Sequence, residues 1–139
     1  MGAAEPRSVA CVGAVVHDAR GRLLVVRRGT PPDQGSWSVP GGRVEAGESD
    51  AEAVVREVAE ETGLRVLAGA VVGLVRIPGP GGVVYEVTDL ACTLVDPDAL
   101  PLAGDDADEV AFVDLATLEQ LTCTPGLRET LGAWGVLPR

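Results

Sequence analysis

The chain has 139 residues, of which 46% are hydrophobic, and it carries a formal net charge of −10 at pH 7. This length and composition exclude a disordered protein and predict one folded domain over residues 1–139, with a flexible start over residues 1–7. The negative charge argues against binding to nucleic acid, because such binding depends on clustered lysine and arginine.

The first part of the chain is rich in strand-forming residues. Two β-rich runs, residues 8–17 and 22–28, are separated by Asp18-Ala19-Arg20-Gly21, which is typical of a hairpin turn. A loop rich in proline and glycine over residues 29–36 then leads to a short strand at 36–39. We therefore expect the chain to begin with a hairpin, followed by a short strand.

A helix follows, and both of its ends can be predicted from capping residues. Ser49 is a favourable N-cap, Glu52 three residues later completes a capping box, and Gly63 stops the helix. Side chains between these ends are thus held on a rigid element. Its apolar residues recur at the spacing of one helical face, which indicates packing on a core: Ala51, Val54, Val55, Val58 and Ala59.

The second half of the chain predicts further strands. They are expected at residues 64–77, 83–95 and 109–113. The segment 78–82, Pro-Gly-Pro-Gly-Gly, forms the turn between the first two of them, because proline and glycine interrupt strands and favour turns.

Two short helices are expected at the end of the chain. Asp114 can cap a helix to about Gln120. Thr124, followed by Pro125 at the first helical position, can open a last helix to about Trp134. Strands and helices mixed in this order predict a layered α/β fold, with a central mixed sheet between helices.

Membrane insertion, export and a disulfide framework are not expected. The longest apolar run, residues 68–75, is far short of the roughly 18 residues that a membrane-spanning helix needs. The start of the chain lacks the apolar segment of a signal peptide. Cys11, Cys92 and Cys123 are widely spaced and form no CxxC pair, which argues against a disulfide framework or a zinc site. We therefore expect a cytoplasmic protein.

The predicted helix carries an unusual concentration of charge, Arg56-Glu57-Val58-Ala59-Glu60-Glu61. Glu57, Glu60 and Glu61 stand at i, i+3 and i+4, so they project from one face and repel one another. Arg56 can balance only part of this charge, whereas Mg²⁺ or Mn²⁺ takes several hard oxygen ligands at once. The cluster indicates a site for a divalent cation, with an ordinary solvated acidic face as the alternative.

Residues before and after this cluster extend it into a longer motif. Residues 42–64 match the pattern G-x5-E-x7-R-E-U-x-E-E-x-G-U, in which U is aliphatic, at every position. The segment therefore resembles the Nudix box, and residues 35–42 resemble the approach to it. The resemblance implies a Nudix α/β/α sandwich with a central mixed sheet, in which the box forms a loop-helix-loop. It also implies a hydrolase that acts on a nucleoside diphosphate linked to another group.

The resemblance assigns roles to the residues of the box. It implies that Mg²⁺ or Mn²⁺ neutralises phosphate oxygens and activates a water, and that Arg56 orients the carboxylates around the metal. The metal residues that it implies are Gly42, through its backbone carbonyl, and Glu48, Glu57, Glu60 and Glu61.

Three residues outside the box are further candidates for the site. Asp106, in the acidic loop before the strand at 109–113, is a candidate metal ligand or general base, with a solvated turn as the alternative. Arg28, at the end of the second strand, is a candidate for binding substrate, with an exposed edge charge as the alternative. Trp37 could stack on a nucleobase or pack beneath the box.

Three functions are compatible with these residues. The first is hydrolysis of ADP-ribose or a similar nucleoside diphosphate sugar, since Pro80 resembles a proline marker of that subgroup. The second is a MutT-like nucleoside triphosphate pyrophosphohydrolase that acts on oxidised or non-standard nucleotides. The third is a nucleotide-sensing module without turnover. By analogy with relatives, the apolar strands at 64–77 and 83–95 offer a surface for a homodimer.

Overall fold

The computed structural model describes residues 7–104 and 106–139. The flexible start expected over residues 1–7 lies outside the described residues, except for Arg7, which begins the first strand. Among the described helices, none is both long and apolar enough to cross a membrane. The elements occur in the order β1 (Arg7–Val16), β2 (Leu23–Arg28), β3 (Trp37–Ser38), β4 (Gly41–Arg43), α1 (Asp50–Thr62), β5 (Val66–Pro78), the 3₁₀ turn η1 (Pro80–Gly82), β6 (Val83–Leu94), β7 (Ala107–Val113), α2 (Leu115–Gln120) and α3 (Leu127–Ala133).

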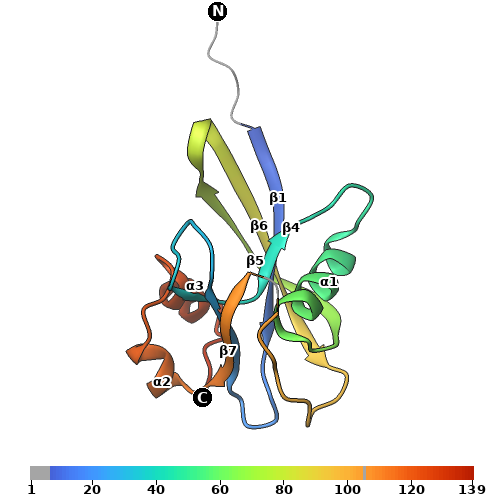
Figure 1. Ribbon diagram of the computed structural model, residues 1–139, viewed down its shortest axis with the longest axis vertical. Helices are drawn as coiled ribbons and strands as arrows, with labels where there is room; N and C mark the ends of the chain where they lie inside the picture. The colour runs from blue at the N-terminus through green and yellow to red at the C-terminus, as the bar shows by residue number, and fades with distance from the viewer. Residues whose placement is uncertain (1–6, 105) are drawn as a thin grey trace, which may run out of the picture.

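The strands form two sheets (Figure 1). One sheet has four strands in the order β4-β1-β6-β5, and the other has three strands in the order β3-β2-β7. β1 runs parallel to β6, whereas β4 pairs with β1 and β5 with β6 in antiparallel orientation. The expected mixed sheet is therefore confirmed. The second sheet is antiparallel throughout.

The prediction of a hairpin over residues 8–28 is correct for its turn and wrong for the pairing of its strands. Asp18 forms the turn as expected, because its carboxylate accepts the backbone N–H groups of Arg20 and Arg22. Among the described residues, β1 and β2 are bridged only at His17 and Leu23, and the two strands then enter different sheets. β2 cannot continue the pairing because β4 and β6 already occupy both edges of β1.

The last helix also differs from the expectation. α3 begins at Leu127, with Gly126 as its N-cap in the left-handed region (φ 79°), instead of beginning at Thr124 and Pro125. The residues before it follow β3, since the backbone N–H of Thr124 donates to the carbonyl of Trp37. The chain is therefore bridged to β3 at Cys123 and turns over residues 124–126, where the helix was expected to start. By contrast, α2 is capped by Asp114 as predicted.

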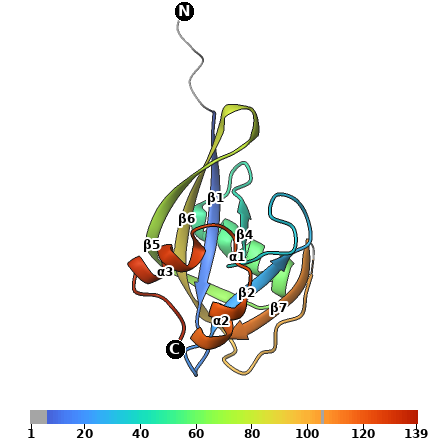
Figure 2. The same ribbon diagram turned by 90° about the vertical axis from the view of Figure 1, so that its left-hand side faces the viewer.

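Helices cover both faces of the mixed sheet (Figures 1 and 2). Alternate residues of β1 point to the two sides. Val16 packs in a core cluster with Val54 of α1. Its neighbour Val15 packs in a second cluster with Leu118 of α2 and Leu131 of α3. The expected α/β/α arrangement is thus confirmed, and it leaves the end of α1 beside the short strand β4.

Candidate active site

The helix α1 has the ends that the sequence predicts. Ser49 and Glu52 form a complete capping box, and Gly63 closes the helix in the left-handed region (φ 72°). The segment after β6 returns to this end, where the N–H of Gly104 donates to the carbonyl of Glu61 at 2.9 Å. A side chain at residue 104 would overlap the backbone of Glu60, so this close return requires glycine. The loop that carries Asp106 is thereby fixed next to the acidic end of α1.

Arg56 is the centre of a network of carboxylates. Its guanidinium donates twice to Glu48, from Nε at 2.7 Å and from Nη2 at 2.9 Å. Nη1 donates to Glu57 at 2.9 Å and to Glu60 at 3.1 Å. The hydrogen bonds from Arg56 lower the pKa of Glu48 to about 2. One arginine therefore orients three of the four glutamates that the motif predicts for the metal site.

The fourth, Glu61, is turned toward β4. Its carboxylate accepts the backbone N–H of Gly41 at 3.2 Å. Burial raises the pKa of Glu61 to about 8, and the charges of Glu57 and Asp106 act in the same direction, against Gly41 and Arg28. A carboxyl group with this pKa lies where a negative charge is poorly compensated by the protein itself.

Glu57 approaches the same short strand. A Cβ added at Gly42 would lie 2.5 Å from Glu57 Oε1, so the glycine leaves room for this carboxylate. Burial raises the pKa of Glu57, although Arg56 partly opposes the effect. The structure thus brings Glu57 and Glu61 together against the two glycines of β4. Within the described residues, however, no three acidic, histidine or cysteine side chains already form a closed metal cage.

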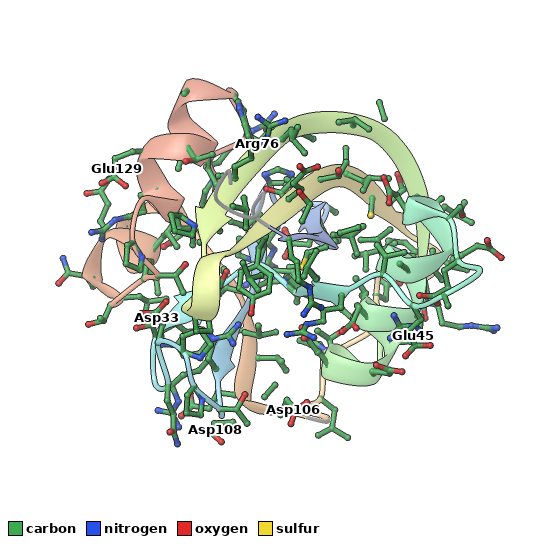
Figure 3. The ribbon with its side chains drawn as sticks, turned by 90° about the horizontal axis from the view of Figure 1, so that it is seen from above. Asp33, Glu45, Arg76, Asp106, Asp108 and Glu129 are labelled. Atoms are coloured by element: carbon green, nitrogen blue, oxygen red, sulfur yellow. The ribbon has the colours of Figure 1, made fainter. Side chains whose placement is uncertain are left out.

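Asp106 and Arg28 lie near this carboxylate pair, since the charges of both act on Glu61. The backbone carbonyl of Asp106 accepts the N–H of Gly29 at 3.0 Å, which ties its loop to the end of β2. Asp106 itself has a positive φ of 61°. The side chain of Arg28 donates from Nε to the carbonyl of Pro32 at 2.7 Å. Figure 3 shows Asp106 and Asp108 along the rim of the molecule that also carries Asp33.

Trp37 occupies a different place from the other candidates. It is half-buried and packs against the core cluster that contains Val25 and Leu131. Among the described residues that line the cavity beside the carboxylates, Trp37 does not occur. Trp37 therefore packs on the side of α2 and α3, and not in the cluster that contains the box helix.

A cavity of about 520 Å³ adjoins the carboxylate pair. Arg28 and the two β4 glycines line the end near the box, and the side chain of Arg43 stands over the ring of Tyr85 at its edge. Most other side chains that line it are apolar: Val75 and Ile77 of β5, Val87 of β6, and Leu127 and Leu131 of α3. A second cavity, of about 320 Å³ near His17 and Arg139, touches no residue of the box.

One lining residue was missed in the sequence. Asp89 of β6 lines the cavity and is only 7% exposed. Burial raises the pKa of Asp89 to about 6. The signal for it was a single charged residue inside the strand-forming run Val87-Thr88-Asp89-Leu90-Ala91, but no nearby motif assigned it a role.

Comparison with known proteins identifies similar chains over most of this length. The family model described as the NUDIX domain matches residues 7–134. The crystal structure of a MutT protein from Methanosarcina mazei Go1 superposes with a TM-score of 0.79 at 25% identity, covering 96% of both chains.

Two curated proteins are also similar. An ADP-ribose pyrophosphatase of Methanocaldococcus jannaschii is 38% identical over 117 residues, which make up 82% of this chain and 66% of that protein. A MutT-like protein of Streptomyces ambofaciens is 45% identical over 67 residues, 48% of this chain and 41% of that protein. The chain therefore spans only part of the length of the curated relatives that it matches.

Proposed function

The chain belongs to the Nudix hydrolase family, and on this basis we propose that it hydrolyses the pyrophosphate linkage of a nucleoside diphosphate joined to another group, with a divalent metal as cofactor. The observation that carries the proposal is the pair of half-buried carboxyl groups, Glu57 and Glu61, held against the glycines of β4 beside a cavity. Two half-buried acidic groups, of which only Glu57 contacts Arg56, next to a space large enough for a nucleotide are suited to a metal-bridged phosphate.

The donor set fits Mg²⁺ or Mn²⁺. Both prefer oxygen ligands, and the residues in reach are carboxylates and backbone groups, with no histidine or thiolate among the residues of the box. We propose Glu57, Glu60 and Glu61 as the metal ligands, supported by Glu48 and by the backbone carbonyl of Gly42. When bound, the cation neutralises phosphate oxygens and lowers the pKa of a water.

The protein's own contribution is to position and to accept a proton. Arg56 holds Glu48, Glu57 and Glu60 at fixed distances, so the carboxylates need little reorganisation when the cation binds. We assign the acceptance of the water's proton to Glu61 before Asp106. Glu61 is fixed on the helix beside Glu57 and accepts the backbone N–H of Gly41, whereas Asp106 is exposed on a loop.

ADP-ribose or a similar nucleoside diphosphate sugar is the proposed substrate. The support is the similarity to the archaeal ADP-ribose pyrophosphatase over 82% of this chain. Pro80, which resembles the proline marker of that subgroup, is the first residue of η1 in the turn between β5 and β6. The similarity to a MutT-like protein favours a second candidate, a nucleoside triphosphate pyrophosphohydrolase. The complete box argues against a sensor without turnover.

A substrate panel with Mg²⁺ and Mn²⁺ tests the proposal through its products. AMP together with ribose 5-phosphate from ADP-ribose supports the first candidate. A nucleoside monophosphate together with pyrophosphate from a triphosphate supports the second. The absence of product from every member at micromolar enzyme would contradict the proposed activity and leave the sensing module as the alternative.

A homodimer through β5 is also proposed. β5 is the edge strand of the mixed sheet, and it exposes four apolar side chains, which favours pairing with a second copy. These are Leu67, Val71, Leu74 and Ile77, each between 48% and 64% exposed. Light scattering after gel filtration tests this proposal, since a monomer at about 50 μM, a concentration at which even micromolar pairing would be visible, contradicts it.

A further inference from the structure

Asp89 stands at the centre of the mixed sheet, on the face that carries the cavity. Its neighbours in register are Gly13 on β1 and Gly73 on β5. A side chain at Gly13 would overlap the carboxylate of Asp89, and a side chain at Gly73 would overlap the ring of Trp134. The two glycines therefore leave space on both sides of a single acidic residue, with Trp134 closing one side.

Within the described residues, one carboxylate oxygen of Asp89 lacks the partner that a buried charge requires. Its Oδ1 is fully buried and, among the described residues, accepts no hydrogen bond. No arginine or lysine contributes to its raised pKa, whose cause is burial alone. Buried carboxylates are usually paired or hydrogen-bonded, because an unpaired one destabilises the folded chain. An acidic residue that destabilises the fold in this way indicates that a bound ligand supplies the missing hydrogen-bond donor.

The position of Asp89 restricts what that ligand group can be. Phosphate is excluded by charge, since two anions repel in a poorly solvated site. The proposed phosphate end of the cavity lies at β4, so the backbone of Asp89 is two strands, or about 10 Å, away from it, and the carboxylate reaches over Gly13 of the strand between them. Further along the strands from this row of residues, the wall of the cavity is largely apolar, with Val75, Val87 and the ring of Tyr85. A flat, mostly apolar group with N–H donors at its edge matches this combination.

We propose that Asp89 is a specificity-determining residue that accepts a hydrogen bond from the amino group of the substrate's nucleobase. This proposal rests on the proposed function, because it assumes a nucleotide with its phosphates at the box. It assigns the cavity between β6 and α3 to the base, and it predicts a preference for amino-bearing bases over the same bases without that group.

Matched pairs of nucleotides test the preference. Adenine is compared with purine, which lacks the 6-amino group, and guanine with hypoxanthine, which lacks the 2-amino group. For at least one pair we expect the wild-type protein to favour the amino-bearing member by about 10- to 100-fold in kcat/KM, the range for a hydrogen bond to a charged group. In Asp89→Ala this ratio should fall to about threefold or less, because the acceptor is gone.

Two further variants protect the result against a folding artefact. Asp89→Asn keeps the shape of the side chain but replaces a charged acceptor by a neutral one, so the ratio should fall without loss of the fold. Glu86→Gln removes a charge from the same strand, outside the cavity lining, and should leave the ratio unchanged. A ratio near one in the wild type, or one unaffected in both Asp89 variants, would overturn the proposal.

Equilibrium binding separates this proposal from the proposed hydrolysis. The Kd values of AMP against purine riboside monophosphate, and of GMP against IMP, are measured by calorimetry without turnover. A preference for the amino-bearing member that disappears in Asp89→Asn supports the proposal even if no substrate is hydrolysed. Equal Kd values within both pairs, or no binding of any of the four, contradict it.

Discussion

Two groups of acidic side chains in this chain differ in how their charge is compensated. Glu48, Glu57 and Glu60 share the guanidinium of Arg56, at distances between 2.7 and 3.1 Å. Asp89 lies deeper in the protein, yet within the described residues its buried oxygen has no partner at all. The first group is held in place by the protein before anything binds, whereas the second depends on what binds.

The difference also reflects how each group is built. The partners of Arg56 come from one helix and the loop before it, so their spacing along the chain already brings them together. The surroundings of Asp89 come from three strands and the end of α3, through Gly13, Gly73 and Trp134. Its environment exists only once the parallel pairing of β1 with β6 has formed.

Removing charge from the helix cluster should have the largest effect on activity. Glu57→Gln or Glu61→Gln removes an anionic oxygen ligand but keeps the shape of the side chain. We expect a loss in kcat of roughly 10²- to 10⁴-fold at saturating Mg²⁺, with an unchanged far-ultraviolet circular dichroism spectrum. Initial rates with the substrate identified from the panel measure it.

Glu52→Gln is the matched control for this prediction. Glu52 lies on the same helix and carries the same charge, but its carboxylate caps the helix start, away from β4. The control should keep near-wild-type kcat. If Glu57→Gln and Glu61→Gln also kept it, the assignment of the metal ligands would be wrong.

The helix and its cluster could be predicted because the evidence for them is local. Ser49, Glu52 and Gly63 define the ends of α1 through contacts within three or four residues, and the motif fixes which glutamates share its face. Strand positions followed in the same way from apolar runs and turn residues, and all predicted strands differ from those found by at most two residues at either end.

The features that could not be predicted depend on pairing between distant segments. The hairpin prediction failed because β4 and β6 compete for the edges of β1. β4 itself was missed, since Gly41-Gly42-Arg43 has low strand propensity and becomes a strand only by pairing with β1. Asp89 was missed for the same reason, because nothing within its own strand shows that it faces a cavity.

Removing the charge of Asp89 should stabilise the protein in a pH-dependent way. Its pKa is about 6 in the folded chain against an ordinary value of 3.8, so folding favours the protonated form. That contribution is fully present below pH 3.8 and is lost as the pH rises through 6. Asp89→Asn should therefore exceed the wild type in free energy of unfolding by a margin that grows to about 3 kcal/mol at pH 7.

Urea denaturation at pH 4 and pH 7 measures this margin. Glu86→Gln, with an exposed charge on the same strand, should show little difference from the wild type at either pH. A margin for Asp89→Asn that is equal at the two pH values would mean that Asp89 finds a partner in the folded protein, such as an ordered water.

Weakening the organisation of the helix cluster should have a smaller effect than removing its ligands. Arg56→Lys keeps the positive charge but loses the planar fork that contacts three glutamates at once. We expect kcat to fall by about 10- to 100-fold, with a higher concentration of Mg²⁺ needed for half-maximal rate, because the carboxylates are no longer pre-positioned. A titration of rate against Mg²⁺ distinguishes this outcome from a loss of chemistry that added metal does not relieve.

The smallest change is expected at Asp106, and it tests where the general base lies. Asp106 is tied to the site through its backbone, by the N–H of Gly29, and its charge acts on Glu61 from a distance. Asp106→Asn should therefore lower kcat by less than about tenfold and keep the acidic limb of the pH–rate profile, because the proposed proton acceptor Glu61 is still present. A fall of two orders of magnitude, with the acidic limb abolished, would instead make Asp106 the proton acceptor. In that case the loop held by Gly104 at the end of α1, and not the helix itself, would supply the base.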